Sequence, residues 1–197
     1  MLGALLTLLA LASTLPDFFD FIATKPGALP PDPLIAYLGP ADLSIPIFSV
    51  LYAVILLAVI SVANRPYLLL RGLFAYALLL VLRMITMTVF TLEPPSDAIP
   101  LLDPVTGPFY PGNAPFVKDL FFSGHTATLA LMAFLVDRKP LRIVAWCATL
   151  AVATMVVTQH VHWTVDVVAA PFAAWAAWAG AGKLTTVFTQ PPAPASA

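Results

Sequence analysis

The feature that most constrains the fold of this chain is a series of long apolar stretches that carry almost no charge. Ile45–Ala63 contains no Asp, Glu, Lys or Arg, and Leu68–Thr91 contains only Arg71 and Arg83. Such stretches are typical of helices that cross a membrane, which need about 20 apolar residues. Over the whole chain 60% of the 197 residues are hydrophobic and 10% are charged, whereas soluble domains carry about 25% charged residues. The sequence therefore predicts an integral membrane protein.

Six apolar stretches predict an all-α fold with six transmembrane helices, at Met1–Leu15, Ile45–Ala63, Leu68–Thr91, Leu120–Val136, Leu141–Gln159 and Thr164–Ala181. The segments 16–44 and 93–119 are Pro-rich and predict loops. The length favours a single domain over residues 1–189, followed by a Pro- and Ala-rich tail, 190–197, that is predicted to be disordered. The first stretch is short and stops at Pro16, so a cleaved signal peptide is the alternative to a first membrane helix, although it lacks a basic start.

Basic residues are distributed unevenly over the connections, and this predicts an orientation. One side carries Arg65, Arg71, Arg138, Lys139, Arg142 and Lys183. The other side carries only Lys25 and Lys118, with Arg83 in the outer half of its helix. Since Lys and Arg are enriched in cytoplasmic loops, the first side and both termini are predicted to be cytoplasmic. The opposite loops then face a periplasmic, extracellular or lumenal space. A net charge of −1 argues against a nucleic-acid partner.

All three histidines fall in two segments on this outer side, 118–126 and 160–166. The first segment opens a predicted helix, where unpaired backbone N–H groups and the helix dipole attract anions. Gly124 lets a ligand approach the backbone, Ser123 adds a hydroxyl, and Lys118 adds a charge. Arg83, deep in a membrane helix, is a functional candidate by default. Together these groups predict a phosphate site.

The second segment predicts a nucleophile. His162 and Asp166 are four residues apart, so they can share one helix face. An Asp that accepts a hydrogen bond from Nδ1 fixes the imidazole tautomer and leaves Nε2 free. Nε2 can then attack phosphorus to give a phosphohistidine. His125, placed across the phosphate, can protonate the leaving alcohol.

Other interpretations of these residues are open. Histidines near a membrane surface can be interfacial polar residues, and His125, His160 and His162 can form a metal site, although no second acid supports one. His160 alone is more typical of a structural residue, and Trp163 of an interfacial aromatic belt. Cys147 is the only cysteine, so no intramolecular disulfide can form, and it is typical of a small core residue.

Three motifs occur in a fixed order: Arg83–Pro95 (RMITMTVFTLEPP), Phe121–Thr126 (FFSGHT) and His160–Val168 (HVHWTVDVV). They resemble the motifs of the sphingomyelin synthase family, a branch of the type 2 phosphatidic acid phosphatase superfamily. Asp119 matches an Asp that the family has four residues before the Ser. The resemblance covers roughly residues 83–168.

This resemblance implies a six-helix transmembrane bundle of the type 2 phosphatidic acid phosphatase type, without metal or other cofactor. It implies His162 as nucleophile, Asp166 as its partner and His125 as acid. The substrate- and phosphate-binding residues are then expected to be Arg83, Lys118, Asp119, Ser123 and Gly124. In the family, a phospholipid donates its phospho-headgroup to ceramide.

Departures from the ordinary phosphatase pattern favour the synthase-like branch. The pattern's Lys and Arg-Pro are absent, Phe122 replaces the Pro before Ser-Gly-His, and Met155 and Val156 replace a Ser-Arg pair. Trp163 replaces the Tyr usual in that branch, so the acceptor is open between a lipid alcohol and water. Water as acceptor would make the protein a lipid phosphatase or a phospholipase C-type hydrolase. A non-catalytic membrane scaffold or lipid carrier is the alternative from another class.

The loop 93–119 is expected to shape the headgroup pocket, because it carries the aromatic residues Phe109, Tyr110 and Phe116. An aromatic surface of this kind would suit a quaternary ammonium group.

Overall fold

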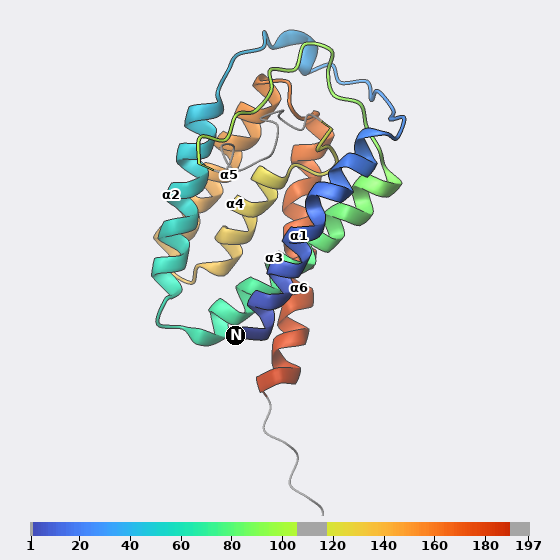
Figure 1. Cartoon of the computed structure of the whole chain (residues 1–197). Coiled ribbons are helices and arrows are strands. Elements are labelled where there is room, and N and C mark those ends of the chain that lie inside the picture. The colour runs from blue at the N-terminus through green and yellow to red at the C-terminus, as the bar shows by residue number, and fades with distance from the viewer. Residues whose placement is uncertain (1, 106–117, 190–197) are drawn as a thin grey trace, which may run out of the picture.

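The computed structural model describes residues 2–105 and 118–189. This part of the chain is helical, with one isolated bridge between Ala28 and Leu92, so the predicted all-α class is confirmed. A short 3-10 helix, Ile35–Tyr37, lies in the segment 24–43 between the first two long helices. The α-helices are α1 (Leu2–Ala23), α2 (Ser44–Val62), α3 (Pro66–Val89), α4 (Gly124–Leu135), α5 (Lys139–Thr158) and α6 (Thr164–Thr189) (Figure 1). The predicted tail 190–197 and the loop aromatics Phe109, Tyr110 and Phe116 lie outside the described residues.

Five of these helices are long and apolar enough to cross a membrane: α1, α2, α3, α5 and α6. The protein is therefore a multi-pass membrane protein. The predicted count of six spans is not confirmed, because α4 has 12 residues and a length of about 18 Å, against about 30 Å of hydrocarbon. The expected helix start at Leu120 is wrong by four residues. Side chains of α3 bind the carbonyls just before α4, since Thr86 donates to Phe121 O and Arg83 to Phe122 O.

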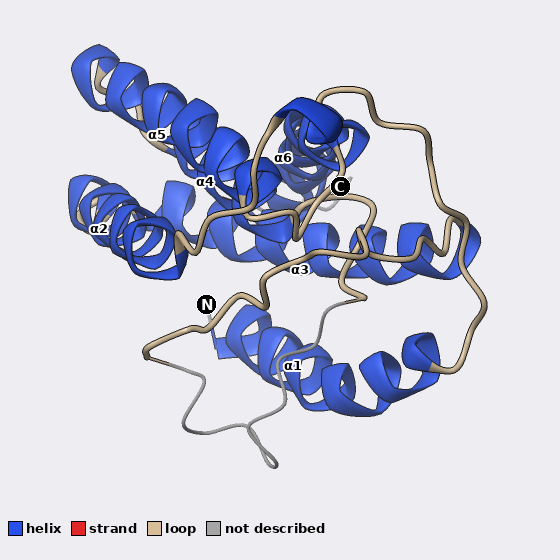
Figure 2. Cartoon of the chain, turned by 90° about the horizontal axis from the view of Figure 1, so that it is seen from above, coloured by secondary structure: helices blue, strands red, loops and turns tan. Residues whose placement is uncertain are grey.

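Helix α4 forms the centre of the bundle and contacts α2, α3, α5 and α6 (Figure 2). Its side chains are almost all buried, and Ala127, Leu129, Ala130, Leu131 and Ala133 are 0% exposed. The small alanines let the neighbouring helices approach closely. The helix that carries His125 is thus held by protein on every side.

Three further expectations from the sequence are wrong. Helix α1 continues through Pro16 to Ala23, since the helix loses a single N–H donor at the proline, and Ile22 in its last turn is buried. Helix α6 continues past Ala181, because Gly182 provides room for the Arg71 side chain instead of ending the helix. Cys147 is exposed on the surface of α5 and is no core residue.

The two ends of the bundle differ in what they carry. The loops between α1 and α2 and between α3 and α4 lie at one end, next to the start of α4 and the α5–α6 connection (Figure 1). The start of α1, the end of α6 and the α2–α3 and α4–α5 connections lie at the opposite end. Both motif segments therefore share one end, and the basic connections share the other. Which compartment each end faces stays a prediction.

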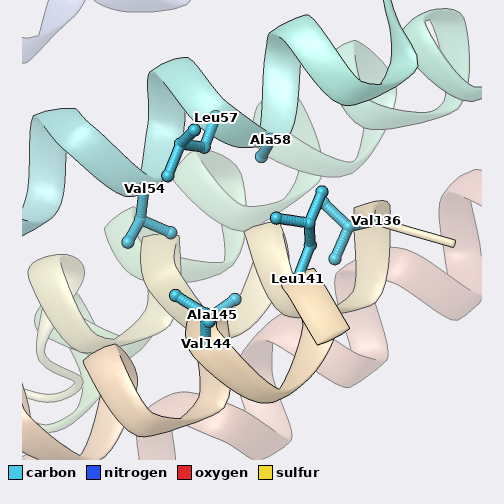
Figure 3. Close-up of a pocket in the computed structure, with 7 residues that line it drawn as sticks. All are labelled: Val54, Leu57, Ala58, Val136, Leu141, Val144 and Ala145. Carbon is cyan, nitrogen blue, oxygen red and sulfur yellow. The ribbon is translucent and has the colours of Figure 1, made fainter. Parts of the chain in front are cut away.

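A small hollow of about 10 Å³ lies between α2, the end of α4 and the start of α5 (Figure 3). Its lining is wholly apolar: Val54, Leu57, Ala58, Val136, Leu141, Val144 and Ala145. It lies at the end of α4 opposite to His125, so it has no part in the histidine chemistry.

Candidate active site

The candidate active site begins at the first turn of α4, which Ser123 caps. The Ser123 hydroxyl accepts hydrogen bonds from Thr126 N at 3.5 Å and from Thr126 Oγ1 at 3.1 Å. Its backbone N–H donates to the carbonyl of Asp166 on α6, at 3.1 Å. Ser123 is 0% exposed. The cap therefore fixes the start of α4 against the start of α6, and it brings the two motif segments together.

Arg83 reaches from α3 to the segment just before α4. Its guanidinium donates to Phe122 O at 2.7 Å and to Asp119 O at 3.3 Å, and it forms an ion pair with the Asp119 carboxylate. Gly124 lies directly against it, and a Cβ at this position would collide with the guanidinium. The structure thus brings Arg83, Asp119 and Gly124 together, as the motifs predict.

Asp119 is the counter-charge of Arg83. Burial raises the pKa of the Asp119 carboxyl, but the charge and the hydrogen bond of Arg83 outweigh burial and hold the pKa below its usual range. Asp119 therefore stays an anion, and an anion does not bind phosphate directly. The carboxylate thus pairs with the Arg83 guanidinium, and the expected part of Asp119 in phosphate binding stays a prediction.

His162 and Asp166 form the pair that the sequence predicts. His162 Nδ1 lies 3.2 Å from Asp166 Oδ2, and the same oxygen accepts from Trp163 N at 3.0 Å. The exposed fractions are 3% for His162 and 0% for Asp166. Because the carboxylate accepts, Nδ1 carries the proton and Nε2 keeps its lone pair. Asp166 also stands in the first turn of α6, where the helix dipole favours an anion.

His125 lies opposite this pair. The ring centroids of His125 and His162 are 6.4 Å apart, and the His125 ring packs edge-on against Phe48 of α2 at 5.4 Å. Its Nδ1 is buried and has no hydrogen-bond partner within the described part of the chain. The two histidines thus lie side by side at the start of α4.

Lys118 is placed differently from the expectation of a phosphate ligand. Its ammonium binds Glu93 Oε1 at 2.6 Å and Lys25 O at 2.5 Å. Glu93 also accepts from Gly27 N at 2.7 Å, and the hydrogen bonds from Lys118 and Gly27 hold the pKa of its carboxyl below the usual range. Lys118 and Glu93 stand at the two ends of the segment 93–118. The contact therefore closes the base of this loop.

His160 and Trp163 both belong to the support of the site. His160 is buried, and its two ring nitrogens lie 2.9 Å from Asp97 Oδ1 and 2.9 Å from Leu38 O, which agrees with the expected structural role. Trp163 is only 7% exposed and donates from its indole to Glu93 O at 2.9 Å, so the expected place in an interfacial belt is wrong. Across residues 2–105 and 118–189, no three His, Cys, Asp or Glu side chains are grouped to hold a metal ion.

One supporting residue was missed from the sequence. Gln159 is 0% exposed and links the α5–α6 connection to the α1–α2 and α3–α4 loops. Its side chain accepts from Leu43 N at 2.9 Å and donates to Ser44 Oγ at 3.0 Å and to Ile99 O at 3.1 Å. A polar residue directly before the histidine motif was the only available signal, and it does not reveal partners so distant in the sequence.

Comparison with known families agrees with part of this picture. Residues 118–181 match the family described as PAP2 superfamily C-terminal. The match contains His125, His162 and Asp166, leaves Arg83 outside, and covers less than half of the chain. No curated protein matches the chain at a significant level. The broad phosphatase-superfamily side of the resemblance is therefore supported, while the sphingomyelin synthase branch stays a prediction.

Proposed function

We propose that the protein is a membrane lipid phosphotransferase that moves a phospho-headgroup from a phospholipid to a lipid alcohol, as sphingomyelin synthases do. The observation that carries the proposal is the arrangement of the two histidines. An Asp166-bound His162 and a second imidazole, His125, lie side by side at a helix start, with ring centroids 6.4 Å apart. A phosphoryl group between them meets a nucleophile on one side and an acid on the other.

In the first half-reaction, His162 Nε2 forms a bond to phosphorus while the bond from phosphorus to the lipid oxygen breaks. The proton of His125 goes to the departing oxygen, which leaves as a neutral alcohol. Asp166 stabilises the positive charge on His162. In the second half-reaction the acceptor hydroxyl gives its proton to His125 and attacks phosphorus. The bond from phosphorus to Nε2 then breaks, and His162 is restored.

The phosphoryl oxygens have donors at the start of α4. The Thr126 amide donates to the Ser123 hydroxyl. The amides of Gly124 and His125, also in the first turn, can then donate to an anion. Arg83 stands directly behind Gly124 and adds positive charge. The absent Cβ of Gly124 is what allows this approach.

The acceptor separates the proposal from its closest alternative. With water as acceptor, the same half-reactions describe a lipid phosphatase or phospholipase C-type hydrolase. Purified protein supplied with phosphatidylcholine and either ceramide or a diacylglycerol with different acyl chains distinguishes them. Transfer gives sphingomyelin or a phosphatidylcholine with the acceptor's chains, and hydrolysis gives free phosphocholine. A scaffold or lipid carrier gives neither product.

Trapping of the intermediate tests the chemistry. Phosphatidylcholine labelled at phosphorus is mixed with the protein and quenched in denaturant at alkaline pH, where phosphohistidine survives. We expect label on His162 and none in the His162→Ala variant. His160→Asn is the matched control, because it removes a histidine of the same segment that binds Asp97 and Leu38 instead. Label on His125, or label in His162→Ala, would assign the nucleophile elsewhere.

The proposal includes an orientation: six membrane crossings, with α4 and the segment before it forming the short fourth crossing, the site facing outward and both termini in the cytoplasm. Cysteines introduced at Val105 and Arg138 in a Cys147→Ala background report it. An impermeant thiol reagent added to intact cells is expected to label only position 105. Labelling only at position 138 reverses the orientation.

A further inference from the structure

A second cavity, of about 380 Å³, lies beside the candidate active site at the outer end of α6. The segment 30–34 of the first outer loop forms one wall, and Trp163, Thr164 and Val165 form the other. Trp163 directly follows His162 in the sequence, and its indole is fixed by the bond to Glu93 O. The cavity therefore shares a wall element with the nucleophile's segment.

The lining of this cavity is apolar except for Asp32 and Thr164, which form hydrogen bonds with each other. Asp32 Oδ2 accepts from Thr164 N at 2.6 Å, and Oδ1 accepts from Thr164 Oγ1 at 3.0 Å and from Leu34 N at 3.1 Å. Burial raises the pKa of the Asp32 carboxyl, but these hydrogen bonds outweigh it and leave the pKa below its usual range. The carboxylate is thus engaged by the start of α6. The remaining lining is proline, leucine, valine and tryptophan.

The cavity continues into an exposed apolar stripe on α6. Val165 in the cavity wall is 45% exposed, and the stripe goes on with Val168 at 57%, Phe172 at 68% and Trp175 at 60%. The spacing of three, four and three residues keeps these side chains on one helix face. In a membrane protein, such a face contacts lipid chains. An apolar path therefore leads from the lipid phase along α6 to the residue after His162.

We infer that this cavity receives an acyl chain of the phospholipid donor, which reaches it from the membrane along the stripe of α6. The inference rests on the proposed function, because it places the donor's chain beside the histidine that attacks its phosphate. A chain in the cavity lets the headgroup bend towards His162 while the apolar part stays out of water. Each methylene that enters an apolar cavity favours binding by a factor of about four, from about 0.8 kcal/mol per CH₂.

Chain length is the test. Dipalmitoyl and dihexanoyl phosphatidylcholine are compared as donors for wild type and for Val165→Trp, which narrows the cavity. Dipalmitoyl and dihexanoyl phosphatidic acid are compared in the same way. We expect KM for the long-chain donor to rise on the order of 10- to 100-fold, as two to three methylenes are excluded, with the short-chain KM unchanged. Leu150→Trp is the matched control: Leu150 is 70% exposed on α5 and lies outside both the cavity and the stripe of α6, so this change should alter neither value. Leu34→Trp narrows the cavity from the loop side and should repeat the effect of Val165→Trp.

An equal loss for both donors, or an equal effect of Leu150→Trp, overturns the inference. So does a chain-length effect that follows the acceptor instead of the donor. A second readout does not depend on turnover: phosphatidylcholine with a diazirine on the acyl chain is photolysed with His162→Ala protein. Crosslinks at Leu34 and Val165 support the cavity assignment, even if no donor is turned over and the proposed function fails. If crosslinks are confined to Phe172 and Trp175 while the wild-type protein is active, the acyl chain does not enter the cavity. The proposed function is then unaffected.

Discussion

Substitution of Asp166 by Asn tests the assignment of the nucleophile, because it changes one atom of the pair and keeps its shape. The carboxylate oxygen lies 3.2 Å from His162 Nδ1. Two unit charges about 4 Å apart interact with about 4 kcal/mol at an effective dielectric constant near 20. If this attraction is lost when His162 becomes positively charged in the transition state, the rate falls by about 10³-fold. The amide also retains an oxygen for Trp163 N and then turns its NH₂ to Nδ1, which favours the wrong tautomer. We therefore expect kcat to fall by about 10³- to 10⁴-fold, the size seen for this change in a Ser-His-Asp triad.

The control is Asp32→Asn, which alters the other carboxylate at the start of α6. Asp32 binds Thr164 and does not contact His162. Loss of a helix cap costs about 1 kcal/mol of stability, so we expect a lower Tm and a kcat within a few-fold of wild type. The assays are single-turnover labelling for the chemical step and thermal unfolding in detergent for the fold. If Asp32→Asn and Asp166→Asn slow labelling equally, the carboxylate of Asp166 has no special relation to His162, and the assignment is refuted.

Three further predictions follow from the site. His125→Ala should slow the reaction of a natural phospholipid by at least 10²-fold but spare an aryl phosphodiester, whose leaving group needs little protonation; similar losses with both would remove His125 from the role of acid. Gly124→Ala should lower kcat/KM without loss of expression, because the new Cβ meets the Arg83 guanidinium; unchanged kinetics would mean that Arg83 does not serve the phosphate. The contact of Glu93 with Lys118 should stabilise the protein above the ordinary Glu pKa of 4.5 and be lost as the pH falls through the lower folded value, so melting curves of Glu93→Gln and wild type should converge in acid and not at neutral pH.

The long apolar stretches made most of the fold predictable. Helices α2, α3 and α5 begin and end within two residues of the expected positions, because a long apolar stretch bounded by Arg-Pro or Lys-Pro leaves few other choices. The start of α4 was not predictable from local pattern. Leu120 and Phe121 are as apolar as a helix requires, but Arg83 and Thr86 bind the carbonyls before the helix, and such tertiary contacts override propensity.

The contacts of the candidate site residues were predictable where the partner lies close in the sequence. Contacts with distant partners were not predictable. His162 and Asp166 are one helical turn apart, so the spacing itself indicates the contact. Lys118 was expected at the phosphate because it precedes a helix start, yet its partner Glu93 stands 25 residues away. Trp163 was expected at the membrane interface because tryptophan is enriched there. Only the fold brings the carbonyl of Glu93 to its indole.

The short helix α4 fixes the position of the candidate site relative to the other helices. His125 is the second residue of a 12-residue helix that is locked between four longer ones, while His162 is positioned independently by the start of α6. One residue added within α4 would turn His125 by about 100° around the helix axis and move it by about 1.5 Å relative to His162. The number of residues in this helix is therefore as strictly constrained as the identity of the two histidines. An insertion or deletion in α4 should be as damaging as loss of either imidazole, although it would leave every reactive side chain in the sequence.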